Sequence, residues 1–154
     1  MKRIALFPGS FDPITVGHEN IIKKSLPLFD EIIVSIGVNG TKQYFFALEK
    51  RIEWIKEIFK NEPKVRVESY TGLTIDFCKK MGAQYILRGL RTATDFEYEN
   101  LIAQNNKVLN PEVETVCIFP DVEVLSVSST VVRDVVRNGG DASKFVSKEV
   151  TLER

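Results

Sequence analysis

Residues 4–18 read Ile-Ala-Leu-Phe-Pro-Gly-Ser-Phe-Asp-Pro-Ile-Thr-Val-Gly-His, and this stretch decides the fold. Its first four residues are an apolar run that predicts a β-strand. Gly9 allows a sharp turn and a close approach of the backbone to a ligand. Thr15 is a preferred residue type for a helix N-cap, so the stretch predicts a strand, a tight turn and a helix that begins near Val16.

The same alternation of strand and helix continues along the chain. Apolar runs predict strands at 4–7, 31–38, 64–68, 85–87 and 115–119, and helical spacing predicts helices at 16–26, 48–59, 73–81, 94–109 and 129–136. Gly82 and Asn110-Pro111 are stop signals for two of these helices. Five such units predict an α/β fold: a doubly wound, five-stranded parallel sheet of Rossmann-like type, in a single domain over 1–154. Periodicity assigns no structure to residues 141–154.

Composition excludes several classes of partner. The chain has 21 Lys and Arg against 21 Asp and Glu, so its net charge is zero and extended nucleic acid is not expected to bind. No apolar run approaches the roughly 18 residues of a membrane span, and the first one is too short for a signal peptide. We therefore expect a cytoplasmic protein with no membrane partner. Cys78 and Cys117 are expected to be buried, reduced thiols, and two cysteines with one histidine predict no zinc site.

Ser10 and His18 are the first candidate functional residues. Ser10 follows the first strand, and in a parallel sheet ligands bind beyond the carboxyl ends of the strands. His18 falls in the first turn of the expected helix, among free N–H groups and at the positive end of the helix dipole. A lone histidine usually has no special task. Its spacing from Ser10 and the Gly17 before it instead favour an anion site with an imidazole beside it.

This segment resembles a known superfamily. Gly9 to Pro13, followed by Thr15-Val16-Gly17-His18, is similar to the T/HxGH signature of the nucleotidyltransferases. The resemblance implies the nucleotidyltransferase variant of the Rossmann-like fold, with Ser10 and His18 at the phosphates of the reacting centre. By itself it gives only the type of reaction.

A second segment, Arg88-Gly89-Leu90-Arg91, follows the fourth expected strand. Two guanidinium groups around a glycine at a strand end suit a phosphate clamp, because arginine offers forked donors and glycine allows close approach. Together with Asp95-Phe96-Glu97-Tyr98-Glu99, the segment resembles the bacterial phosphopantetheine adenylyltransferase branch. That resemblance extends from residue 4 to about residue 146.

The resemblance implies a role for each matching residue. His18, as a transition-state stabiliser, and Lys42 would be catalytic, and the acceptor would be bound by Ser10, Lys42, Thr74 and Arg88. ATP would be bound by Ser10, Phe11, His18, Gly89, Leu90, Arg91, Glu99, Val124, Leu125, Ser126, Val127, Ser128, Ser129 and Thr130. Three hydroxyl residues at the start of the last helix also predict a phosphate cradle without any resemblance. Arg133 replaces the lysine common in this branch, and its role is left open.

The reaction that the resemblance implies joins the phosphate of 4′-phosphopantetheine to the α-phosphorus of ATP. Mg²⁺ would accompany ATP, coenzyme A would be a feedback inhibitor, and the assembly would be a homohexamer. One alternative is another member of the superfamily, such as a nicotinate-mononucleotide adenylyltransferase or a glycerol-phosphate cytidylyltransferase. A different alternative is a regulatory module that binds ATP without turning it over.

Overall fold

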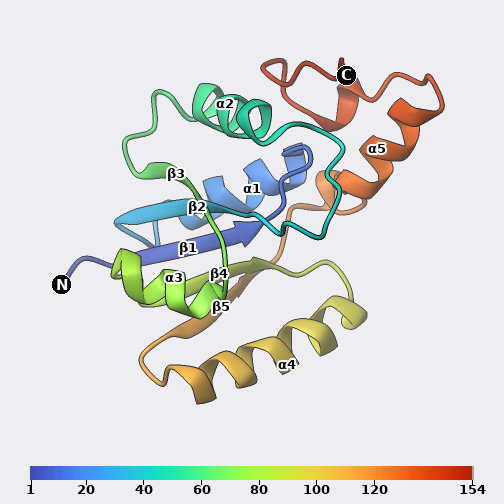
Figure 1. The fold of residues 1–154 in the computed structure, drawn as a ribbon. Helices are drawn as coiled ribbons and strands as arrows, with labels where there is room; N and C mark the ends of the chain where they lie inside the picture. The colour runs from blue at the N-terminus through green and yellow to red at the C-terminus, as the bar shows by residue number, and fades with distance from the viewer. Residues whose placement is uncertain (154) are drawn as a thin grey trace.

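Five parallel strands form one sheet in the computed structural model of the chain, which describes residues 1–153 (Figure 1). The strands are β1 (Ile4–Gly9), β2 (Glu31–Gly37), β3 (Val65–Tyr70), β4 (Tyr85–Gly89) and β5 (Glu114–Ile118). Their order in the sheet is β3-β2-β1-β4-β5, and every neighbouring pair is parallel. The predicted fold class is confirmed.

Helices connect successive strands and cover both faces of the sheet. They are α1 (Val16–Ser25), α2 (Leu48–Ile58), α3 (Thr74–Met81), α4 (Ala93–Leu109) and α5 (Ser129–Arg137), with short 3₁₀ helices at η1 (Val122–Val124) and η2 (Ser143–Phe145). Thr15 caps α1 as predicted, since its hydroxyl accepts the N–H of His18 at 3.4 Å. Gly82 ends α3 with a φ of 68°, the left-handed conformation that glycine adopts at little cost.

Strand β1 has no polar face, because its successive side chains enter two different cores. Ala5 and Phe7 pack in the larger core with α1, α2 and α5, whereas Leu6 packs in the smaller core with α3. Alternate side chains of a strand point to opposite faces of its sheet. A strand buried on both faces has a continuous apolar sequence, which is why β1 and β2 could be predicted from the sequence.

The winding of the chain reverses at β1. From β1 the chain moves outward to β2 and β3, and it then returns to the other side of β1 to form β4 and β5. The loops after β1 and β4 therefore leave the sheet in opposite directions and open a crevice between them. Gly89 ends β4 against α1, and a Cβ there would lie 3.2 Å from Cγ1 of Ile21.

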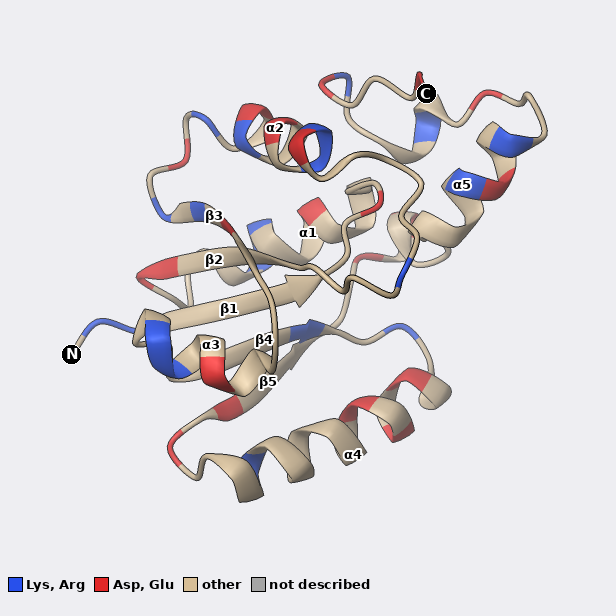
Figure 2. Cartoon of the chain, viewed as in Figure 1, with Lys and Arg blue, Asp and Glu red and all other residues tan. Residues whose placement is uncertain are grey.

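Helix α4 differs from the other helices in how little of it is buried. Of its 17 residues only Glu99 is buried, although the helix carries many apolar side chains. Figure 2 shows its acidic residues in the N-terminal half and few charges beyond them. No helix among residues 1–153 is long and apolar enough to cross a membrane.

Two expectations need correction or completion. Cys78 is buried as predicted, and burial raises the pKa of its thiol to about 12. Cys117 is exposed, so its predicted burial is wrong: it lies on the edge strand β5, which α4 covers only loosely. The unassigned C-terminal segment packs Ala142, Val146 and Val150 into the larger core. Residue 154 lies outside the described residues.

Candidate active site

His18 is held by a reciprocal cap at the start of α1. The ring nitrogen Nδ1 accepts the backbone N–H of Thr15 at 3.0 Å, while the Thr15 hydroxyl accepts the backbone N–H of His18. A neutral imidazole that accepts at one nitrogen carries its proton on the other. The geometry therefore fixes the tautomer of His18 with the proton on Nε2, and the ring lines a cavity at the end of β1.

His18 is a neutral donor, not a cation. Burial, and after it the positive charges of Arg91 and Arg88, lower the pKa of its imidazole from 6.5 to about 4. At pH 7 the ring is uncharged. It can still donate one hydrogen bond from Nε2 to an anionic oxygen, which is a common way to stabilise charge that develops during a reaction.

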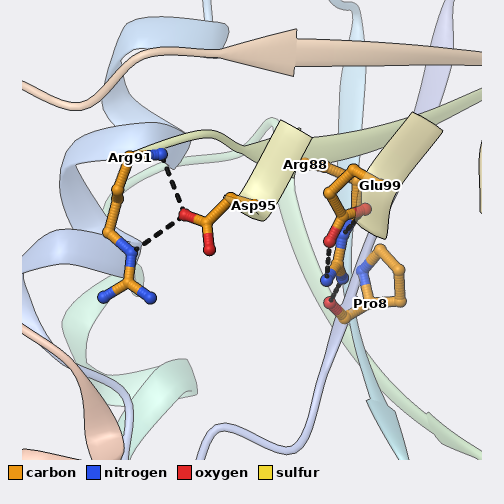
Figure 3. Close-up of polar contacts among 5 residues, drawn as sticks. All are labelled: Pro8, Arg88, Arg91, Asp95 and Glu99. Carbon is orange, nitrogen blue, oxygen red and sulfur yellow. Dashed lines mark hydrogen bonds and ion pairs between the residues drawn. The ribbon is translucent and has the colours of Figure 1, made fainter. Parts of the chain in front are cut away.

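Arg88 donates hydrogen bonds from all three of its guanidinium nitrogens (Figure 3). Its Nε and Nη2 donate to the two carboxylate oxygens of Glu99 at 2.9 and 2.8 Å, and its Nη1 donates to the Pro8 carbonyl at 2.7 Å. The Glu99 side chain is 9% exposed and that of Arg88 is 30% exposed. Such a forked pair fixes the guanidinium plane as well as its position.

Arg91 lies in a separate cluster, as Figure 3 shows. Its backbone N–H and its Nε donate to the same oxygen of Asp95, at 3.0 and 3.4 Å. Its Nη1 donates to the carbonyl of Val127 at 3.3 Å, so the side chain reaches the segment that precedes α5. The two arginines of the sequence motif thus face different surroundings.

Two adjoining cavities occupy the crevice, and the Arg88–Glu99 pair lies where they meet. The first, of about 400 Å³, is lined by His18, Arg91 and the start of α5. The second, of about 520 Å³, is lined by Ser10, Lys42 and Thr74. Five residues line both cavities: Pro8, Gly9, Arg88, Tyr98 and Glu99. The site can therefore hold two ligands that touch across Arg88.

Most of the predicted site residues line one of these cavities or the other, but Ser10, which was also expected to bind ATP, lines only the second. The first cavity collects the expected ATP residues Phe11, His18, Gly89, Arg91, Glu99, Val124, Val127, Ser128, Ser129 and Thr130. The second collects the expected acceptor residues Ser10, Lys42, Thr74 and Arg88. Leu90, Leu125 and Ser126 line neither cavity: Leu90 is buried under the sheet end, and the other two face outward.

The start of α5 presents two kinds of polar group. Its hydroxyls already make hydrogen bonds, and its first backbone N–H groups are those of a helix N-terminus. Ser128 caps the helix by accepting the N–H of Val131 at 3.2 Å, and Ser129 donates to the Pro13 carbonyl at 2.8 Å. Arg133 donates to the Asp12 carbonyl at 2.8 Å and to the Thr130 hydroxyl at 3.2 Å. Arg133 thus ties α5 to the β1–α1 loop, a role that its sequence position did not reveal.

Lys42 comes from the loop between β2 and α2 and reaches across to the end of β1. Its Nζ donates to the hydroxyl of Ser10 at 3.1 Å. Sequence spacing offers no separate reason to bring these two residues together, because they are 32 positions apart. Both line the second cavity, so a cation and a hydroxyl face any anion that enters there.

Residues of α4 complete the site and were missed by sequence reasoning. Tyr98 lines both cavities, and Ile102, Ala103 and Asn106 line the second. These positions, with Glu99, share one face of the helix because they are three or four residues apart. That spacing was visible in the sequence, but the apolar residues elsewhere on α4 obscured it.

Comparisons with known proteins identify relatives of this chain. Residues 6–135 match the cytidylyltransferase-like family. A phosphopantetheine adenylyltransferase of Flavobacterium psychrophilum is 56% identical over 98% of this chain and 99% of its own length. That of Bacteroides fragilis is 45% identical over 97% of this chain and 99% of its own. A solved structure from Vibrio parahaemolyticus, described as a nicotinate-nucleotide adenylyltransferase, has a TM-score of 0.74 and 20% identity. It covers 97% of this chain and 90% of its own, and it supports the fold alone.

Proposed function

The chain belongs to the phosphopantetheine adenylyltransferase family, and from this premise we propose that it transfers the adenylyl group of ATP to 4′-phosphopantetheine. The products are 3′-dephospho-coenzyme A and pyrophosphate. The observation that carries the proposal is the pair of cavities that meet at Arg88. A reaction between two phosphate-bearing molecules needs two adjacent sites with positive charge at their junction.

The acceptor phosphate needs no general base. Its second pKa is about 6, so it is largely dianionic at pH 7 and can attack directly. We assign the reaction to alignment of two charged reactants and to stabilisation of charge on the α-phosphoryl oxygens. Nε2 of His18 supplies a neutral donor from the nucleotide side, and Nζ of Lys42 supplies a cation from the acceptor side.

We propose that the first cavity holds ATP and the second holds the acceptor. The start of α5 and the Arg91 side chain lie on one side of the partition, where they can receive the nucleotide phosphates. Ser10, Lys42 and Thr74 lie on the other side, with Arg88 between. The proposed roles of Leu90, Leu125 and Ser126 would require contacts through backbone atoms or a movement of the loop, since they line neither cavity.

Mg²⁺ is proposed to enter with ATP. Among residues 1–153 no group of three or more His, Cys, Asp or Glu side chains could hold a metal ion. A site without such a cluster fits an ion that is bound mainly by the nucleotide phosphates and water, as Mg²⁺ commonly is. The bound ion would neutralise part of the triphosphate charge, while the protein orients the phosphates.

We also propose that the chain forms a homohexamer. The surface of α4 exposes Phe96, Leu101, Val108 and Leu109, each by more than half. Large exposed apolar patches on a protein usually mark a contact site, which supports contact between copies through α4. The number six rests on the resemblance. Light scattering tests it: a monomeric mass at assay concentration would contradict the proposal.

We also propose that coenzyme A inhibits the enzyme as a feedback inhibitor and that the protein is located in the cytoplasm. Coenzyme A contains the phosphopantetheine arm of the acceptor, so it would compete for the second cavity. Inhibition should therefore be competitive with phosphopantetheine. A cytoplasmic location would place the chain with its nucleotide substrate.

The function is tested by product formation. Purified protein with ATP, Mg²⁺ and phosphopantetheine should form dephospho-coenzyme A, with pyrophosphate released in equal amount. Pyrophosphate release should be absent without the acceptor, and CTP or nicotinate mononucleotide should support much slower turnover. Faster turnover with nicotinate mononucleotide would overturn the acceptor assignment. ATP binding with no pyrophosphate release would favour a regulatory module.

A further inference from the structure

Asp12 lies at the turn after β1 but does not face either cavity. Its side chain is 5% exposed, and its two oxygens accept backbone N–H groups from the loop between β2 and α2. The N–H of Phe45 is 2.7 Å from Oδ2, and the N–H of Phe46 is 2.8 Å from Oδ1. The carboxylate therefore joins two loops that are more than 30 residues apart in the chain.

Arg51 makes a second connection between the same two loops. It projects from the first turn of α2 and is only 2% exposed, an unusual degree of burial for an arginine. Its Nε donates to the Phe46 carbonyl at 3.0 Å, and its Nη1 donates to the Ser10 carbonyl at 2.8 Å. One buried cation thus binds the backbone of both loops, and one of the residues that it binds is Ser10, which Lys42 contacts.

Tyr44 completes the connection on the side nearest Lys42. Its ring lies 4.3 Å from the Arg51 guanidinium carbon and 5.3 Å from Nζ of Lys42. Its hydroxyl accepts the N–H of Asn39 at 3.0 Å and donates to the Gly37 carbonyl at 3.1 Å. The turn that carries Lys42 is exposed, but both of its ends are tied down.

We propose that Asp12, Arg51 and Tyr44 are positioning residues that hold the β2–α2 loop so that Nζ of Lys42 stays over Ser10. This inference rests on the proposed function for the role of Lys42. A long lysine on an exposed turn would otherwise sample many positions, and small misplacements of a catalytic group cost large factors in rate. Asp12 and Arg51 line neither cavity and Tyr44 lines the second beside Lys42, so we assign all three an action through Lys42.

The competing assignment makes Asp12 a general base or a ligand of Mg²⁺, since it follows the reactive turn. The geometry favours the positioning role because each carboxylate oxygen already accepts a backbone hydrogen bond. Asp12→Asn separates the two assignments. It keeps the size of the side chain but replaces one acceptor oxygen with a donor, so one backbone N–H loses its partner.

The first test is a double-mutant cycle with Lys42→Ala. Asp12→Asn should lower kcat about tenfold to a hundredfold in the wild type, but less than about twofold when Lys42 is already alanine. Tyr44→Phe, which loses only a hydroxyl, should follow the same pattern at about two- to tenfold. The matched control is Asp134→Asn, an exposed carboxylate on α5, which should leave kcat unchanged in both backgrounds.

The second test needs no substrate. Trypsin should cut after Lys42 about tenfold faster in Asp12→Asn than in the wild type, because a loosened loop opens more often. Cleavage of Tyr44→Phe should also be faster than that of the wild type, by a smaller factor. Asp134→Asn should be cut at the wild-type rate. This arm decides the positioning role even if the wild type forms no dephospho-coenzyme A, a result that would refute the proposed function alone.

Three results would overturn the proposal. The first is an equal loss of kcat for Asp12→Asn with and without Lys42, which would give Asp12 a role of its own. The second is a tenfold rise in the Mg²⁺ concentration needed by Asp12→Asn with unchanged trypsin cleavage, which would make it a metal ligand. The third is that Tyr44→Phe has the same kcat and the same rate of trypsin cleavage as the wild type. This result would decide against the proposal even if Asp12→Asn does not fold.

Discussion

The two cavities of the crevice present positive potential in different ways. The first relies on the start of α5, on a neutral imidazole and on Arg91. The second relies on the cation of Lys42, a long and flexible side chain. Its Nζ donates to the Ser10 hydroxyl, and Arg51 binds the Ser10 carbonyl. Backbone dipoles and a neutral donor need no reorganisation when charge develops, whereas a lysine must be kept in place. The difference indicates that the donors of the first cavity are fixed by helix ends and those of the second by loop contacts.

The largest effect is expected at His18. His18→Ala should lower the single-turnover rate by about 10²–10³, because a donor to the transition state is lost, and should change ATP affinity little. Rapid-quench formation of dephospho-coenzyme A beside an ATP titration measures both.

His18→Gln is the control for the helix cap. Glutamine at this position can still reach back to the N–H of Thr15, so the cap is kept while the imidazole is removed. A wild-type rate in His18→Ala would show that the ring is a capping residue only, and the contrast between the cavities would lose its main support.

A smaller effect should separate the two arginines. Arg91→Ala should weaken ATP binding about tenfold to a hundredfold and acceptor binding little, because Arg91 lines only the first cavity. Arg88→Ala should weaken phosphopantetheine binding more than ATP binding. Calorimetry with each ligand measures these losses.

The Arg88 variant needs a partner change. Removing Arg88 leaves the buried Glu99 carboxylate uncompensated, which is costly in itself. Arg88→Ala should therefore be combined with Glu99→Gln and compared with Glu99→Gln alone. Equal losses for both ligands in both arginine variants would mean that the two cavities are not separate sites.

The neutral state of His18 should appear in the pH dependence of stability. The folded pKa is about 4 and the ordinary value is 6.5, so between these pH values the unfolded chain binds a proton that the folded chain does not. Stability should thus rise with pH across that window, by at most about 1.4 kcal/mol per pH unit, and level off above it.

The chain has one histidine, so His18→Gln isolates this contribution. Glu19 has a raised pKa, caused first by burial, and should give an opposite slope in both proteins, which cancels in the difference. Urea unfolding from pH 4 to pH 7.5 gives the comparison. Identical slopes in the two proteins would show that the folded chain binds the proton as readily as the unfolded one.

The smallest effect is expected at Thr74, on the acceptor side. Its hydroxyl is 2.7 Å from the Tyr70 hydroxyl. The family resemblance implies that Thr74 contacts the acceptor largely through its backbone. Thr74→Ala should change the KM for phosphopantetheine less than about threefold, the equivalent of a weak hydrogen bond. Steady-state kinetics would show it, and a tenfold rise would mean that the side chain itself binds the acceptor.

Much of this fold was determined locally by the sequence. Three features follow from short-range steric and hydrogen-bonding preferences: the strand that ends at Gly9, the helix cap at Thr15 and the helix end at Gly82. They could therefore be predicted from neighbouring residues. The continuous apolar runs of β1 and β2, which are buried on both faces, predicted these two strands equally clearly.

The residue types of the site could also be read, because phosphate chemistry needs glycine at close approach and arginine or hydroxyl donors at strand and helix ends. What they do to one another could not. The position of His18 at a helix N-terminus already disfavours its charged form, but the burial and the arginine charges that lower its pKa come from other elements. The pairing of Arg88 with Glu99 does not follow from spacing either.

Only the tertiary structure decided which loops meet. It brought Lys42 to Ser10, Arg51 to the backbone of both loops, and Arg133 to Asp12 across 121 positions. It also left Cys117 exposed on an edge strand, where an apolar sequence context predicted burial. Contacts between distant segments depend on strand order and helix packing, and local sequence specifies neither. The composition of the site was thus determined by the sequence, and its arrangement by the order β3-β2-β1-β4-β5.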